Sequence, residues 1–369
     1  MSLKARVFGS LNSGASARRG YSSFRRACSR LSGLCVLLTI GAVGAVAAVA
    51  QEPSVTNSEK AVRAYVTNFA GDGVSVIDPY RGTVVAEIPT GTKPHGVAVA
   101  PDGTAVYVSN EGDGTLSIID PTRNSLIETV SLGKEPNQLE VSADGRYVFV
   151  TLHGQDALAV VDVRRREVVN TVPVGRHPHI ALRSPDGDTV YVTSEGDMKL
   201  VAIDATTRKP QFEVPLFGWP RVLAVSADGR TGYQTMRWLN GTLVIDFQAQ
   251  RVVDRIAFAM PTFAPEGKDA HGPALTPDGE ELWLTTQTSN DVAVIRTENR
   301  RLLRRIPVGQ DPNWIAFTPD GQLAVVSNTA SNDVSVIDTA RYSVVATIAV
   351  GRSPKRLAIG TVETGVPRP

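Results

Sequence analysis

Short runs of aromatic and β-branched residues recur along the chain at a nearly constant interval. Successive runs are separated by 42, 42, 42, 42, 50 and 42 residues. A repeat of this length, built from strand-forming residues, is typical of a four-stranded propeller blade. Seven runs predict an all-β, seven-bladed β-propeller, and they begin at Tyr65, Tyr107, Phe149, Tyr191, Tyr233, Trp283 and Val325.

Turn residues divide each repeat into four strands. In the second repeat, Pro101-Asp102-Gly103 follows an inner strand, and Asp and Gly favour tight turns because they tolerate the backbone angles required. An Asp-Gly turn of this kind, preceded by Pro or Ala, occurs six times, so one of the seven blades must be composite. Residues 63–89 supply three strands without an inner strand, and Lys355 to Gly360 supplies an inner strand alone. Pairing the two would close the ring and remove its open edges.

Paired valines such as Val84-Val85, Val160-Val161 and Val344-Val345 are typical of strands that are buried on both faces between blades. The aspartates that end the third strand of most repeats are expected to be turn residues, because Asp bonds to the backbone two residues on. They are Asp78, Asp120, Asp162, Asp204, Asp246 and Asp338, with Arg296 in the remaining blade.

The N-terminal segment differs in composition from the repeats. Residues 1–50 hold seven basic residues and no acidic ones, and their apolar stretch runs from Leu34 to Ala50. This pattern predicts a secretory signal peptide cleaved after Ala50, with an uncleaved membrane anchor as the alternative. We therefore expect a signal peptide or anchor at 1–50, a tether at 51–62, the propeller at 63–361 and a C-terminal tail at 362–369. A periplasmic or secreted location follows, with membrane contact only through an uncleaved N-terminal segment.

Charge and cysteine content exclude several classes of function. Residues 51–369 contain 31 basic and 37 acidic residues, a net charge of −6, which disfavours nucleic-acid binding. Both cysteines, Cys28 and Cys35, precede the repeats, so the propeller has no thiolate ligand, nucleophile or disulfide.

The motifs of the repeats resemble a known family. A Tyr-Val-Thr-Asn strand, a Ser-Val-Ile-Asp strand and a Pro-Asp-Gly turn, over about residues 63–360, are similar to the YVTN family of propeller repeats. The late stretch Ser331 to Asp338 and the enlarged fifth spacing resemble propellers that accompany PQQ-dependent (pyrroloquinoline-quinone-dependent) alcohol catabolism. The resemblance implies service to a periplasmic quinoprotein or cytochrome system. Related propellers carry haem or bind nucleic acid, so the fold alone does not choose a function.

One position of each repeat gathers polar residues around the predicted channel. It lies at the entry of the inner strand, and closure of the ring would place all seven side chains at one mouth. These residues, called the ring residues below, are His95, Asn137, His179, Arg221, His271, Asn313 and Lys355. Loops on the same face add Glu111, His153, Glu195 and Trp238 as candidate ligand-binding residues.

Three interpretations of the ring remain open at this stage. The polar groups could cap strand ends and meet water. Arg221 and Lys355, with the histidines, could bind a carboxylate or an acidic partner, because the guanidinium fork suits paired oxygens. His95, His179 and His271 could ligate a metal or haem, since imidazole is a common ligand. The sequence does not identify a cofactor.

Recognisable enzyme motifs are absent from the sequence. It has no Cys-x-x-Cys-His, His-Glu-x-x-His or Gly-x-Ser-x-Gly stretch and no catalytic residue that the pattern singles out. This favours a non-enzymatic binding or scaffold protein whose working surface is the channel mouth, with a periplasmic protein or a small anionic ligand as its partner. The alternative is an enzyme at the same mouth, either metal- or haem-dependent or a lactonase-type hydrolase.

Overall fold

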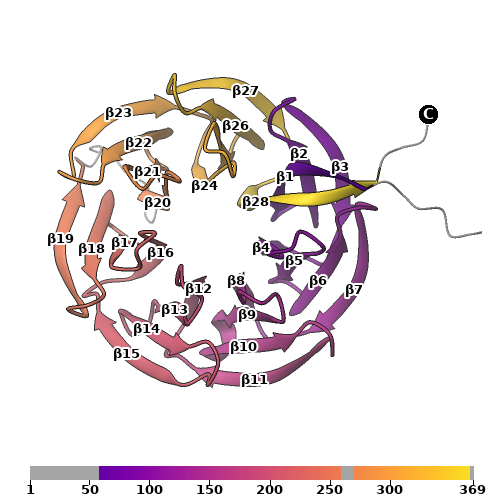
Figure 1. Cartoon of the computed structure of the whole chain (residues 1–369), viewed down its shortest axis with the longest axis horizontal. Helices are drawn as coiled ribbons and strands as arrows, with labels where there is room; N and C mark the ends of the chain where they lie inside the picture. The colour runs from indigo at the N-terminus through magenta and orange to yellow at the C-terminus, as the bar shows by residue number, and fades with distance from the viewer. Residues whose placement is uncertain (1–57, 259–269, 366–369) are drawn as a thin grey trace, which may run out of the picture. The chain divides into compact units, whose positions relative to one another are not determined.

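Seven four-stranded antiparallel sheets form a closed ring in the computed structural model, which describes residues 58–258 and 270–365 (Figure 1). The predicted seven-bladed propeller is confirmed. The described ranges contain one helical turn, η1 (His153–Gln155), and no helix that could span a membrane. The predicted signal peptide and most of the predicted tether lie outside the described residues.

The composite blade closes the ring as predicted. Its strand order is β28-β1-β2-β3, so the last strand of the chain pairs with the first, for example at Ala64 and Ile359. The two strands extend beyond the predicted limits, because residues 58–62 and 362–365 belong to strands and not to the tether or the tail. The four strands are β28 (Pro354–Gly365), β1 (Ser58–Asn68), β2 (Gly73–Asp78) and β3 (Thr83–Pro89).

The other six blades each use four strands that are consecutive in sequence, from the innermost to the outermost. Blades two to four are β4 (Pro94–Val99), β5 (Val106–Asn110), β6 (Thr115–Asp120) and β7 (Ser125–Ser131); β8 (Pro136–Val141), β9 (Tyr147–Leu152), β10 (Ala157–Asp162) and β11 (Glu167–Pro173); and β12 (Pro178–Arg183), β13 (Thr189–Ser194), β14 (Lys199–Asp204) and β15 (Pro210–Pro215). Blades five to seven are β16 (Pro220–Val225), β17 (Thr231–Met236), β18 (Gly241–Asp246) and β19 (Arg251–Ala257); β20 (Ala270–Leu275), β21 (Glu281–Thr286), β22 (Asp291–Arg296) and β23 (Leu302–Pro307); and β24 (Pro312–Phe317), β25 (Leu323–Asn328), β26 (Asp333–Asp338) and β27 (Ser343–Ala349).

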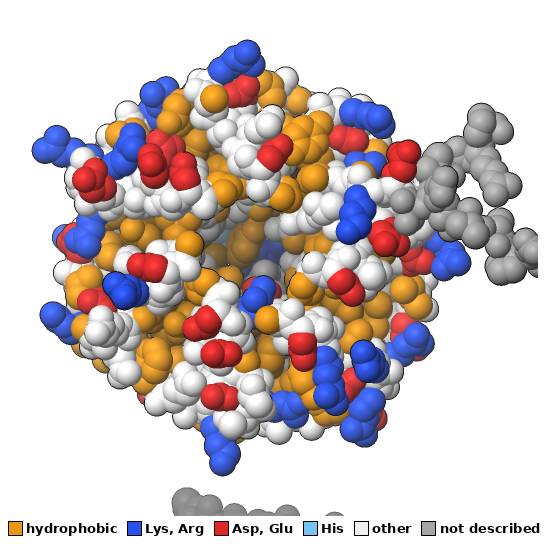
Figure 2. All heavy atoms as spheres, viewed as in Figure 1, with side chains coloured by type: hydrophobic (Ala, Val, Ile, Leu, Met, Phe, Trp, Pro, Cys, Tyr) orange, Lys and Arg blue, Asp and Glu red, His pale blue; other side chains and the backbone are white. Residues whose placement is uncertain are grey.

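The hydrophobic core lies between neighbouring blades. One cluster joins Val66 and Ile77 of the composite blade to Val325 and Val334 of the seventh blade, so the first and last blades share a core. Figure 2 shows the hollow at the centre of the ring, with mainly hydrophobic side chains on its visible wall. Burial of apolar surface between blades therefore holds the ring closed.

The expectation that paired valines are buried on both faces holds for the third strand β10 but not for the fourth strands β3 and β27. Val160 and Val161 of β10 are fully buried. Val85 of β3 and Val345 of β27 are 41% and 52% exposed, because the fourth strand of a blade lies at the rim with one face in solvent. That part of the prediction is wrong.

The hydroxyl residue of each recurring motif joins its blade to the next. Thr67 Oγ1 donates a hydrogen bond to the main-chain oxygen of His95 at 2.8 Å, and Thr235 Oγ1 donates to that of His271 at 2.8 Å. The same bond occurs in all seven blades, always to the ring residue of the following blade. The other five pairs are Ser109 with Asn137, Thr151 with His179, Thr193 with Arg221, Thr285 with Asn313, and Ser327 with Lys355. The motif therefore fixes the backbone that carries the ring residues.

The aspartates at the ends of the third strands are turn residues, as predicted. Asp78 Oδ1 accepts hydrogen bonds from the main-chain nitrogens of Tyr80 and Arg81 at 3.1 and 3.0 Å. The pair of bonds recurs at Asp120, Asp162 and Asp204, and Asp246 and Asp338 each accept one such bond.

Candidate functional site

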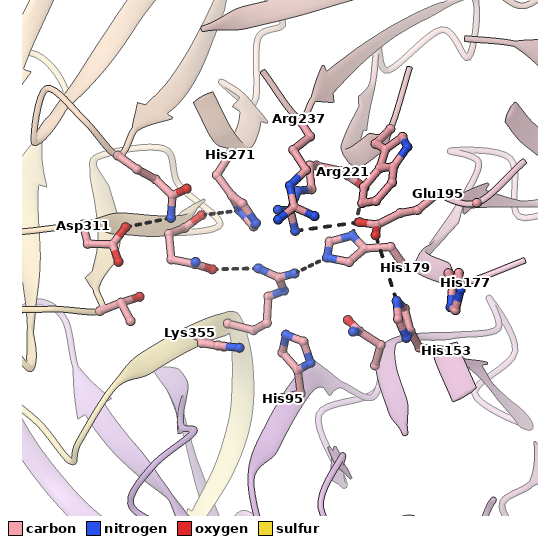
Figure 3. A pocket seen from close by; sticks show the side chains of 17 residues that line it. His95, His153, His177, His179, Glu195, Arg221, Arg237, His271, Asp311 and Lys355 are labelled. Carbon is pink, nitrogen blue, oxygen red and sulfur yellow. Dashed lines mark hydrogen bonds and ion pairs between the residues drawn. The ribbon is translucent and has the colours of Figure 1, made fainter. Parts of the chain in front are cut away.

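All seven ring residues line one cavity of about 520 Å³ at a mouth of the central channel. Each is the second residue of its inner strand, such as His179 in β12 and Arg221 in β16. Figure 3 shows the labelled side chains converging on this cavity from different blades. Residues as distant in sequence as His95 and Lys355 are therefore brought together.

The cavity contains every histidine of the chain. The sequence has five, and His95, His153, His177, His179 and His271 all line the cavity. His153 and His177 stack with ring centroids 4.9 Å apart, and those of His179 and His271 lie 6.2 Å apart. Such convergence of titratable groups in a concave site is characteristic of binding and catalytic sites.

His179 and His271 are held as neutral rings. Burial lowers the pKa of both far below the usual value, and the nearby Arg356 guanidinium lowers it further. His271 Nδ1 lies 2.9 Å from the main-chain oxygen of Asn313, and His179 Nδ1 lies 3.1 Å from that of Arg221. A carbonyl oxygen only accepts, so Nδ1 carries the proton in both rings and Nε2 has the lone pair.

The two rings differ at Nε2. In His179 this nitrogen accepts a hydrogen bond from Arg356 Nη2 at 3.1 Å. In His271 it has no hydrogen-bond partner among residues 58–258 and 270–365. His271 is therefore a buried imidazole that, unlike His179, can take a proton from a molecule in the cavity.

Glu195 forms an ionic network on one side of the cavity. Its Oε2 lies 4.0 Å from His153 Nε2, and its Oε1 lies 3.7 Å from Arg221 Nη1. Burial alone would raise the pKa of Glu195, but His153, His179 and Arg221 together lower it to about 2. Glu195 in turn raises the pKa of His153 against the opposing effect of burial. Glu195 is thus a buried carboxylate at neutral pH.

Two predicted residues do not line the cavity itself. Glu111 instead contacts the ring residue His95, with its Oε2 2.8 Å from His95 Nδ1. Trp238 packs on Trp219 at a centroid distance of 5.3 Å and is 52% exposed. The other predicted residues, Asn137, His153, Glu195 and Asn313 among them, do line it.

Sequence reasoning left several lining residues out of the predicted set. They come from the third position of an inner strand, from loops between blades or from loops between the second and third strands of a blade. They include Arg356, His177, Asp311, Arg237, Gln287 and Thr329. Arg356 is the most consequential, because it is 2% exposed and bonds to two ring residues. Comparison of the seven inner strands could have found it, since the other six have no charge at this position.

Two of the three histidines predicted as metal ligands are already used in other side-chain contacts. His95 faces Glu111, and both ring nitrogens of His179 are hydrogen-bonded. Within the described part of the chain, no group of three or more His, Cys, Asp or Glu residues is arranged to hold a metal ion.

Comparison with known proteins identifies the family. The family described as "Lactonase, 7-bladed beta-propeller" matches residues 83–345, which is well over half of the chain. The chain belongs to this family. No curated protein matches it in sequence.

Solved structures share the fold at low sequence identity. A Kuenenia stuttgartiensis hydrazine synthase is 22% identical, with a TM-score of 0.69, over 75% of this chain and 92% of that chain. The Pseudomonas aeruginosa periplasmic gluconolactonase is 23% identical, with a TM-score of 0.67, over 82% and 99%. A putative 6-phosphogluconolactonase from Bacteroides fragilis is 17% identical, with a TM-score of 0.67, over 84% and 100%.

The family match corrects the main functional prediction. A non-enzymatic binding or scaffold protein was expected because the sequence lacks recognisable enzyme motifs. Membership of a lactonase family contradicts that expectation and favours its alternative, a lactonase-type hydrolase. The absence of motifs was misleading because ring residues from different blades, such as His179 and His271, become neighbours only through closure of the ring.

Proposed function

We propose that this lactonase-family propeller hydrolyses lactones in the cavity at the channel mouth. The observation that carries the proposal is His271, a buried neutral imidazole whose Nδ1 is bonded to Asn313 and whose Nε2 lone pair remains available in the cavity. A neutral imidazole with an available Nε2 lone pair can act as a general base.

The reaction follows from that geometry. His271 Nε2 takes a proton from a water molecule as its oxygen bonds to the lactone carbonyl carbon. The tetrahedral intermediate collapses with cleavage of the ring C–O bond, and the imidazolium returns the proton to the departing alkoxide. Lactone and water give a hydroxy acid, which ionises at neutral pH. Arg221, on the blade next to His271, supplies positive charge for the oxyanion of the intermediate.

The charges that line the cavity favour an anionic substrate. Four cationic side chains and two carboxylates line it, although the repeats are acidic as a whole. A cleft with one excess sign of charge concentrates ligands of the opposite sign. We therefore propose a small anionic lactone as the ligand class. The cations are Arg221, Arg237, Lys355 and Arg356, and the carboxylates are Glu195 and Asp311.

A periplasmic or secreted location and the YVTN repeat label are part of the same proposal. The basic and apolar N-terminal segment supports export, and the repeating Tyr-Val-Thr-Asn strands support the label.

The test incubates purified protein with a panel of lactones and monitors the release of acid by pH-stat titration. The panel pairs neutral and negatively charged γ- and δ-lactones. We expect turnover above the spontaneous rate, with higher kcat/KM for charged members. The control variant Thr206→Val, a change at an exposed turn that does not line the cavity, should hydrolyse the panel at the rate of the unmodified protein. Folded protein that hydrolyses none of the lactones would overturn the proposal.

A further inference from the structure

Arg356 is an exception among the seven inner strands. It is the third residue of β28, next to the ring residue Lys355, and its side chain is 2% exposed. The third residue of every other inner strand is uncharged: Gly96, Gln138, Ile180, Val222, Gly272 and Trp314. One blade therefore places a guanidinium in the channel at a level where the other six place none.

The guanidinium is held across the channel by neutral groups. Nη1 donates to Asn313 Oδ1 at 2.7 Å, and Nη2 donates to His179 Nε2 at 3.1 Å. The guanidinium carbon lies 4.5 Å from the centre of the Trp314 ring. These contacts fix the plane of the fork and leave Arg356 as a wall of the cavity.

This buried cation has no counter-charge in contact with it. Among residues 58–258 and 270–365, no carboxylate lies within ion-pair distance of Arg356, and its Nε is buried without a hydrogen-bond partner. Burial of an unpaired charge is costly. Burial and the Arg221 charge lower the pKa of Arg356 to about 9, although Glu195 and Glu111 act in the opposite direction from a distance, so the group is still a cation at neutral pH. A bound anion would offset this cost.

The same guanidinium is linked to the proposed base. Asn313 accepts from Arg356 through its side-chain oxygen and from His271 through its main-chain oxygen, at 2.7 and 2.9 Å. One residue therefore sets the positions of both groups. An anion bound to Arg356 would lie at a fixed place relative to His271 Nε2.

We propose that Arg356 is the specificity-determining anchor for an oxyanion substituent of the substrate, separate from the lactone carbonyl that His271 serves. The substituent is a carboxylate or a phosphate, because the planar fork pairs with two oxygens of either group. This inference rests on the proposed function, since it names the part of that substrate that the cavity recognises.

The experiment measures binding and not turnover, by isothermal titration calorimetry with open-chain hydroxy acids. D-gluconate has one carboxylate, D-glucarate has a second carboxylate, and 6-phosphogluconate has a phosphate. We expect at least one of the two ligands with a second anionic group to bind about 10- to 100-fold more tightly than D-gluconate. The ligand that gains affinity identifies carboxylate or phosphate as the group.

Arg356→Met should abolish this preference, and Arg356→Lys, which keeps the charge but loses the fork, should reduce it several-fold. Arg341→Met, which removes an exposed surface charge, is the matched control and should retain it. If Arg356→Met does not fold, the lysine variant decides. Full preference in a folded Arg356 variant, or no preference in the unmodified protein, would overturn the anchor. Lactone turnover by the panel is a separate result, so the anchor and the proposed function can fail independently.

Discussion

Arg356 and His179 meet across the central channel although 177 positions separate them in the sequence. The guanidinium of Arg356 donates from β28 to Nε2 of His179 on β12, at 3.1 Å. This contact uses the lone pair of His179, whereas the Nε2 lone pair of His271 remains available in the cavity. Two chemically identical ring residues therefore differ in whether Nε2 is occupied, and we propose that only His271 acts as a base.

The roles of the two histidines can be separated by substitution at His179. Gln offers an oxygen that can accept from Arg356, whereas Ala leaves that donor unsatisfied. We expect His179→Gln to keep most of kcat and His179→Ala to lose about 10-fold or more, because an unsatisfied charged donor costs about 1–3 kcal/mol. Steady-state kinetics on the best lactone gives the comparison. Equal losses in the two folded variants would show that His179 has a role beyond accepting from Arg356.

The pH dependence of kcat/KM should reflect the depressed pKa of His271. Burial disfavours the imidazolium, so the neutral base persists as the pH falls. We expect the rate to stay level through pH 6.5 and to decline only at lower pH. Arg356→Met removes a charge that lowers this pKa, so the decline should move to higher pH. An acid limb centred at or above pH 6.5 in the unmodified protein would contradict the assignment.

Glu195 should control the titration of His153. Its carboxylate raises the pKa of His153, and burial opposes this effect. In Glu195→Gln, we expect the pKa of His153 to fall relative to that in the unmodified protein, as measured from its ring resonances by NMR. Glu135→Gln is the matched control, because Glu135 is the more exposed of the two carboxylates near this ring. A larger effect of Glu135→Gln would reverse the assignment.

The motif hydroxyls should stabilise the ring. Thr235 is fully buried, and its Oγ1 donates to the His271 main-chain oxygen at 2.8 Å and accepts from Val222 N at 3.0 Å. Thr235→Val removes the partner of the His271 oxygen and of the Val222 nitrogen, so we expect the free energy of unfolding to fall by about 1–3 kcal/mol. Denaturant unfolding measures the change. The exposed Thr206→Val should change stability by less than about 0.5 kcal/mol, and an equal effect at both sites would contradict the role of the hydroxyl.

Closure and the ring could be predicted because both follow from the repeat period. Once the interval of 42 residues is recognised, His95 and His179 must occupy equivalent places on different blades. The hydrogen bonds of Thr67 and Thr235 to the following blade show why the interval places them so accurately. The repeat interval therefore predicts which residues occupy equivalent positions on different blades.

Chemistry within the ring could not be predicted in the same way. Arg356 departs from the repeat, and its effect depends on contacts with Asn313 and His179 that only closure creates. The difference between His179 and His271 likewise depends on which ring nitrogen another blade reaches. Enzyme motifs are defined by residues close together in sequence, whereas most residues of this cavity come from different blades. A motif search therefore does not find the site.

Chemical rescue at His271 tests the central claim most directly. The measurement is the hydrolysis rate of the best lactone by His271→Ala, with and without free imidazole. We predict a loss of about 10²- to 10⁴-fold on substitution, as for removal of a general base, and a saturable recovery when imidazole enters the vacated space. An unchanged rate in folded His271→Ala would contradict the account.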